Sequence, residues 1–113
     1  MTSWVKKEFC AIDLGDDRLN VRFWKIAEAF LERPSGSMSE ITGNWADTKA
    51  SYRFFSNEKV TKNQLLRPHV ARTIERMNKT GKTTLVIQDT TYLDYTHHPQ
   101  TKGLGKLARP MKG

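Results

Sequence analysis

Apolar residues recur at helical spacing through the first two thirds of the chain, and this periodicity limits the folds available to it. Between residues 17 and 32, one stripe of a helix is formed by Leu19, Phe23, Ile26, Ala27 and Phe30. Pro34, followed by Ser35-Gly36-Ser37, is typical of a helix end and the start of a loop. The pattern therefore predicts a helix from Asp17 to about Glu32.

Three further helices are predicted from caps and spacing. Ser3 is a suitable cap for a short helix through Phe9, and Asn44 for a helix from Trp45 to Phe55. Thr61, with Gln64 three residues later, has the spacing of a capping box that opens a fourth helix. Because proline lacks a backbone donor, we expect that helix to break near Arg67, with Pro68 starting a new turn.

The period changes after Gly81. Residues 83–89 (TTLVIQD) form a short β-branched run that predicts a buried strand, and residues 91–95 (TYLDY) predict a second strand after a tight turn. We therefore expect a mainly α fold, with a small helical domain over residues 1–80 and a short β hairpin in residues 81–113. A lone strand pair is marginal in water unless it packs on something else.

The charge balance narrows the choice of partner. The chain has 19 Lys and Arg against 12 Asp and Glu, a net charge of +7, which attracts polyanions. DNA, RNA, anionic membranes and acidic proteins all fit, and so does a basic protein without such a partner. We find no signal peptide and no apolar run of membrane-spanning length, so we expect a cytoplasmic protein with no membrane partner. The single cysteine, Cys10, has no partner for an internal disulfide.

Two basic helix flanks are the candidates for phosphate contact. One carries Arg18, Arg22 and Lys25, and the other carries Lys49 and Arg53. Arginine also reads guanine edges in the major groove, and Ser37, with its neighbouring serines, can add hydrogen bonds to phosphate. The alternative is that these are ordinary solvated helix faces. The hypothesis requires arginines from two helices to meet on one surface, free of internal ion pairs.

Aromatic residues of the same region have two interpretations. Trp45 and Tyr52 can stack on bases, but aromatics at helical spacing more often belong to a core. We therefore expect one side of this helix to be apolar, formed by Trp45, Thr48, Tyr52 and Phe55. Residues 56–59 between two helices loosely resemble the turn of a helix-turn-helix motif.

Asp89 is the strongest candidate for chemistry. It follows an apolar strand, and its carboxylate is the type of ligand that Mg²⁺ prefers. Metal-assisted phosphoryl transfer needs more than one such acid, and Asp94 is the only later one. On the residues alone, a carboxylate that ends the strand and accepts turn hydrogen bonds is the favoured interpretation. His97 and His98 are adjacent on a loop and point in opposite directions, so we expect surface histidines.

Three motifs in order carry a family resemblance. They are residues 13–19 (DLGDDRL), residues 49–57 (KASYRFFSN) and residues 85–95 (LVIQDTTYLDY). The chain from about residue 4 to 105 resembles the N-terminal quarter of bacterial insertion-sequence transposases of the IS-four group, of which the Tn-five transposase is a member.

The resemblance implies both a function and a limit to it. In that family the N-terminal helical domain binds the inverted repeats at transposon ends, and Arg18, Arg22 and Arg53 match basic positions that face DNA. The strand before Asp89 opens an RNase H-like catalytic domain, and Asp89 matches the first acid of an Asp-Asp-Glu triad that binds Mg²⁺. The sequence departs from the family after Gly105 and lacks the other two acids. We therefore expect neither catalysis nor a bound cofactor in this chain.

Three hypotheses follow for the function. The chain binds double-stranded DNA at transposon ends and competes or pairs with full-length transposase. Alternatively, it is a relic without a selected function that self-associates through an exposed strand over residues 85–87. The least favoured hypothesis is a complete small nuclease that uses Asp89, Asp94 and His97.

Overall fold

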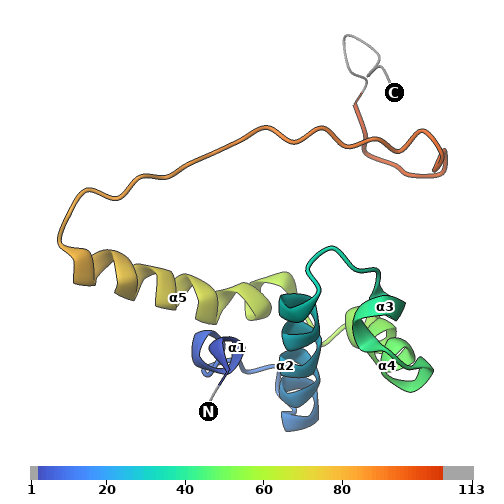
Figure 1. Cartoon of the computed structure of the whole chain (residues 1–113), viewed down its shortest axis with the longest axis horizontal. Coiled ribbons are helices and arrows are strands. Elements are labelled where there is room, and N and C mark those ends of the chain that lie inside the picture. The colour runs from blue at the N-terminus through green and yellow to red at the C-terminus, as the bar shows by residue number, and fades with distance from the viewer. Residues whose placement is uncertain (1–2, 106–113) are drawn as a thin grey trace. The chain divides into compact units, whose positions relative to one another are not determined.

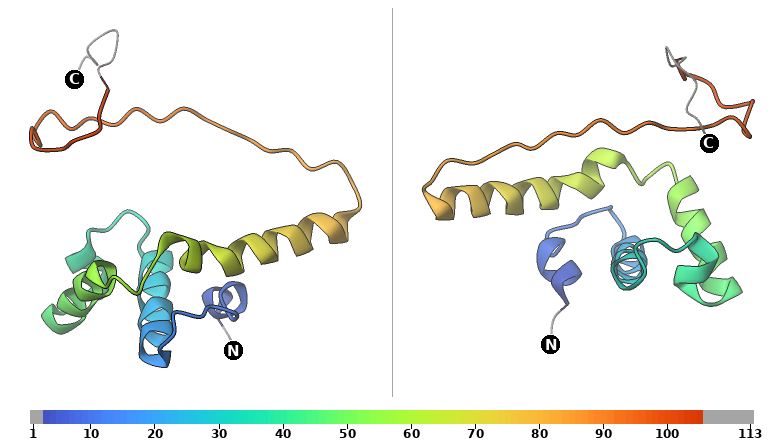
Figure 2. Two further views of the ribbon diagram at one scale, coloured as in Figure 1. Left: turned by 180° about the vertical axis from the view of Figure 1, so that it is seen from behind. Right: turned by 45° about the horizontal axis from the view of Figure 1, so that its top comes forward.

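The computed structural model describes residues 3–105 and divides the chain into two units, Met1–Thr83 and Thr84–Gly113. All helices belong to the first unit (Figure 1): α1 (Trp4–Glu8), α2 (Asp17–Glu32), α3 (Met38–Thr42), α4 (Trp45–Ser56) and α5 (Lys62–Thr80). Helix α2 lies between α1 and the α3–α4 pair (Figure 2), and α5 packs on α1. The expectation of a mainly helical chain is confirmed.

The turn between α1 and α2 explains the first motif. Gly15 has a φ of +80°, a left-handed conformation that glycine adopts without steric cost. The side chain of Asp16 then caps α2 by accepting a hydrogen bond from the Arg18 amide at 2.9 Å. Leu14 before the turn is 2% exposed, and its amide donates to Asn20 Oδ1 at 3.0 Å. The motif therefore fixes the entry of the chain into α2.

The core lies where α2, α4 and the α1–α2 turn meet. Its buried members are Ile12, Leu14, Ile26 and Phe54, with Leu19, Phe23, Trp24, Val60 and Leu65 packed around them. Phe23 contacts Phe9 at a ring-centroid distance of 4.9 Å, and Trp24 Nε1 donates to the Phe9 carbonyl at 3.1 Å. The apolar stripe predicted for residues 19–30 thus supplies much of the core, although Phe30 is partly exposed.

Helix α3 was missed by the sequence analysis, which placed only a loop after Pro34. Its start resembles a capping box: the Ser37 amide donates to Glu40 Oε2 at 2.8 Å. Its end is Gly43, with a φ of +72°. Ser37, Glu40 and Gly43 were readable signals of a helix, but five residues hold too little apolar periodicity to reveal one.

Helix α5 runs without interruption through Pro68, so the predicted break near Arg67 is wrong. The capping box at its start is confirmed, with the Gln64 amide donating to Thr61 Oγ1 at 3.3 Å. Proline removes one amide donor from a helix but has a φ compatible with it. On the C-terminal side of Pro68 the helix contacts α1 through His69, Arg72 and Arg76.

The predicted β hairpin is wrong, because no strand is present in residues 3–105. Residues 85–87 are extended, and their side chains are 79–88% exposed. A β-prone sequence becomes a strand only when another strand pairs with its backbone. Within the second unit, residues 91–95 supply no such partner, and turns follow at 96–97 and 99–100.

Candidate nucleic-acid interface

Helix α4 has a polar and cationic face that points away from the core. Asn44 caps the helix by accepting from the Asp47 amide at 2.8 Å, as predicted. Thr48, Ser51 and Phe54 are buried on the inner side, while Lys49 and Arg53, four residues apart, are exposed on the outer side. Neither cation has an ion pair with the residues that the structure describes.

The predicted apolar side of this helix is wrong. Trp45 is 77% exposed and Tyr52 is 59% exposed, so neither belongs to the core. Both lie at the spacing that places them beside Lys49 on the outer face. We define the outward face of α4 as Trp45, Lys49, Tyr52 and Arg53. It combines two aromatic rings with two cations.

A shallow groove of about 440 Å³ brings the predicted cations of α2 together. It is lined by Asp17, Arg18, Val21, Arg22 and Lys25. Arg18 is 92% exposed and pairs with Asp16, two residues before it, at 2.9 Å. Hydrogen bonding by the Arg18 side chain lowers the pKa of Asp16. An ion pair this exposed contributes little to stability, so Arg18 can exchange Asp16 for a phosphate at low cost.

Arg22 has a different environment. Its guanidinium donates to Asp47 Oδ1 on α4 at 3.0 Å, and its side chain is only 28% exposed. The Asn44 amide and then Arg22 lower the pKa of Asp47. The pair borders a cavity of about 270 Å³ between α2, α3 and α4. Arg22 therefore braces α2 against α4, and a role in contacting DNA would compete with this bond.

Ser37 lies at the start of α3, where its hydroxyl is 3.3 Å from that of Ser39. Its side chain is exposed. The structure thus places the predicted polar contacts in three locations: the α2 groove, the outward face of α4 and the start of α3.

The pair of helices predicted to resemble a helix-turn-helix motif does not pack together. Helices α4 and α5 do not pack on each other, whereas α3 and α4 do. Gly43 and Asn44 join α3 to α4 in a short turn, and Gly43 adopts the left-handed conformation. Two packed helices joined by a short glycine-containing turn are typical of a helix-turn-helix unit, in which the second helix enters the major groove. Helix α4 is the second helix of the α3–α4 pair.

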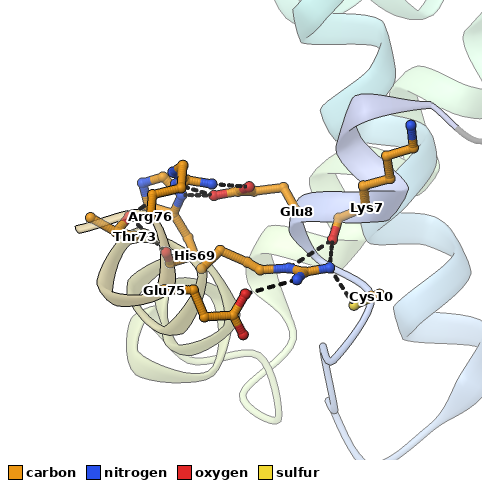
Figure 3. A network of polar contacts seen from close by, with 8 residues as sticks. Lys7, Glu8, Cys10, His69, Thr73, Glu75 and Arg76 are labelled. Carbon is orange, nitrogen blue, oxygen red and sulfur yellow. Dashed lines mark hydrogen bonds and ion pairs between the residues drawn. The ribbon is translucent and has the colours of Figure 1, made fainter. Parts of the chain in front are cut away.

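Two arginines of α5 bind internal acceptors. Arg76 forms two hydrogen bonds of 2.8 Å with the two Glu8 carboxylate oxygens (Figure 3), and His69 Nδ1 lies 2.7 Å from Oε1. Glu8 is 4% exposed, and hydrogen bonding by Arg76 is the main cause that lowers its pKa to about 2. Arg72 donates to the Lys7 carbonyl at 3.0 Å and pairs with Glu75. These contacts join α1 to α5 and engage Arg72 and Arg76 within the fold.

The second unit holds the residues predicted for chemistry. Asp89 is exposed, and its Oδ1 accepts from the Thr90 amide at 2.8 Å. Asp94 accepts hydrogen bonds from Thr96, whose side chain lowers the pKa of Asp94. His98 closes a turn with the Tyr95 carbonyl at 2.8 Å. Across residues 3–105, no three acidic, histidine or cysteine side chains gather as a metal site would require, so the described residues do not fit a two-metal centre.

In the part of the chain that the structure describes, no helix combines the length and apolar character needed to cross a bilayer.

Comparison with known proteins identifies the family. Neither the curated proteins nor the solved structures yield a match to this chain. The family model described as transposase DNA-binding matches residues 1–60, which is more than half of the 113 residues and includes α1 to α4. On this match, the chain belongs to the transposase DNA-binding family.

Proposed function

We propose that the helical unit binds double-stranded DNA at the inverted-repeat ends of a transposon, with α4 in the major groove. The observation that carries this proposal is the outward face of α4, where Lys49 and Arg53 have no carboxylate partner among the described residues. Cations without internal partners are available to phosphates and to base edges. The resemblance to IS-four group transposases supplies the inverted repeat as the target.

The α2 groove contributes contacts to the DNA backbone. Arg18 and Lys25 are exposed there, and a helix packed behind the recognition helix commonly crosses the backbone in helix-turn-helix proteins. Ser37 adds a hydrogen bond to phosphate at the start of α3. Arg22 acts indirectly, because its bond to Asp47 holds α4 at a fixed position relative to α2.

The proposal covers binding and not cleavage. Asp89 is one exposed carboxylate, and two-metal phosphoryl transfer needs at least one more acid beside it. We therefore assign no step of strand cleavage to the described residues. The role of Asp89 as the first triad acid stays a prediction for a complete catalytic domain. Competition or pairing with full-length transposase would follow from binding the same ends.

The test compares two duplexes in a fluorescence anisotropy titration of the full chain. One is the inverted repeat that borders the coding sequence, and the other has the same composition in scrambled order. At about 0.15 M salt we expect the repeat to bind at least tenfold more tightly, because base contacts add to the nonspecific charge attraction. Equal affinity for both duplexes across a salt series would contradict recognition of the repeat.

Self-association is a second candidate, favoured by the exposed side chains of residues 85–87. An extended apolar segment without a backbone partner is prone to pair with another copy. Sedimentation velocity of the full chain over a range of concentrations tests this. A concentration-dependent oligomer that disappears in Val86→Lys would support it, and a monomer at all concentrations would exclude it.

A further inference from the structure

Two large aromatic side chains on the outward face of α4 are unexplained by phosphate binding. Trp45 and Tyr52 are 77% and 59% exposed, so neither contributes its full apolar area to folding. They lie beside Lys49 and Arg53, at positions i, i+4, i+7 and i+8 of one helix. An exposed aromatic pair bordered by cations indicates a surface that contacts a partner.

The spacing of the two rings fits a run of base pairs. Seven residues separate Trp45 from Tyr52, which is about 10.5 Å at the rise of an α-helix. Base pairs are about 3.4 Å apart along the duplex, so the two rings span about three base-pair steps. A helix lying in the major groove would place each ring against a different base pair.

The groups exposed in the major groove limit what an aromatic ring can contact there. Base edges in this groove carry hydrogen-bond donors and acceptors, and the only apolar group is the C5 methyl of thymine. Stacking on a base face requires an unpaired base, which a regular duplex does not offer. We propose that Trp45 and Tyr52 select thymine in the major groove by contacting its methyl group. This inference rests on the proposed function. It adds that two residues of the same surface, Trp45 and Tyr52, determine the sequence preference.

The experiment removes the methyl groups from the DNA without changing base pairing. The inverted-repeat duplex is compared with the same duplex in which deoxyuridine replaces every thymidine. Burial of one methyl group corresponds to about a fourfold change in affinity, so we expect wild-type protein to bind the substituted duplex about 4- to 15-fold more weakly. The double variant Trp45→Ala/Tyr52→Ala should bind both duplexes equally.

Two control variants isolate the aromatic contribution. Lys49→Ala/Arg53→Ala should bind both duplexes more weakly but keep the wild-type ratio between them. Trp4→Ala removes another exposed tryptophan, 54% exposed on α1, and should keep both the affinity and the ratio. Thermal unfolding of each variant confirms that the fold is intact.

The outcomes distinguish this inference from the proposed function. If wild-type protein binds both duplexes equally while Lys49→Ala/Arg53→Ala still weakens binding, thymine selection is wrong and DNA binding stands. Tighter binding to the single strand of the repeat than to the duplex would also overturn thymine selection, in favour of stacking on unpaired bases. If the repeat has no advantage over scrambled DNA and the α4 cations have no effect, the proposed function fails.

Discussion

The outward face of α4 and the contact between α1 and α5 both carry arginine, but the two regions use it in opposite ways. Arg53 has no carboxylate partner among the described residues, whereas Arg76 binds both oxygens of Glu8 at 2.8 Å. The net charge of +7 therefore does not show which cations are available to bind an anion. A cation that pairs with a buried acid stabilises the fold, whereas a cation without such a partner is available to bind a ligand.

The largest expected effect is on DNA affinity. Lys49→Ala/Arg53→Ala should weaken binding to the inverted repeat about 10- to 100-fold, because a cation that contacts a base edge typically contributes 1–3 kcal/mol, by order of magnitude. The melting temperature should hardly change, since both side chains are exposed and outside the core. Anisotropy titration and thermal unfolding measure the two quantities.

The matched control for this variant is Arg67→Ala/Lys79→Ala. It removes the same charge from exposed positions on α5, beyond the residues that match the DNA-binding family. A comparable loss of affinity in this control would show that net charge, and not the outward face of α4, governs binding.

The opposite behaviour is expected for Arg76→Ala. This change leaves Glu8, 4% exposed, with His69 as its remaining side-chain partner, and removing one partner of a buried pair is destabilising. We expect the melting temperature to fall by several degrees and the affinity for the repeat to stay within about twofold at a temperature where the variant is folded. An unchanged melting temperature would mean that the α1–α5 contact does not support the helical unit.

A smaller effect should appear in the dependence of stability on pH. The folded-state pKa of Glu8 is about 2, below its usual value of 4.5, so its ion pair contributes fully above pH 4.5. The contribution should decrease as the pH falls from 4.5 towards 2. Denaturant unfolding at several pH values should show this decrease in wild-type protein and a smaller one in Arg76→Ala. Parallel pH profiles for the two proteins would contradict the assignment.

The smallest expected effect concerns a single phosphate contact. Lys25 is exposed in the α2 groove, and Lys25→Ala should lower the slope of log affinity against log salt by about one. Preference for the repeat over scrambled DNA should stay the same, because a phosphate contact carries no sequence information. A changed preference with an unchanged slope would place Lys25 on a base instead.

Local signals in the sequence were sufficient to predict four of the five helices. The predicted caps at Ser3, Asn44 and Thr61 all function as expected, since capping involves residues within one turn of each other. The first two motifs of the family resemblance fall in α1 to α4, the region where the family match lies. The third motif, over residues 85–95, forms no strand in the described residues.

Contacts between distant residues could not be predicted in this way. The bond between Arg22 and Asp47 joins positions 25 residues apart, and the bond between Glu8 and Arg76 joins positions 68 apart. The residues next to Arg22 in the sequence do not indicate that it bonds to Asp47 on α4. Lys25 lies one turn further along the same helix and is exposed. The predicted DNA-binding set therefore mixes exposed cations with one that braces two helices.

The sequence by itself determined the starts of α1, α2, α4 and α5, the net positive charge and the family, because these depend on short-range patterns and on residue identity. Only the tertiary structure decided which side of α4 faces the core. The inner side is Thr48, Ser51 and Phe54, and Trp45 and Tyr52 remain in solvent. The physical reason is that burial is a property of packing: the side that α2 and α3 cover becomes the core, even where the other side carries larger apolar groups.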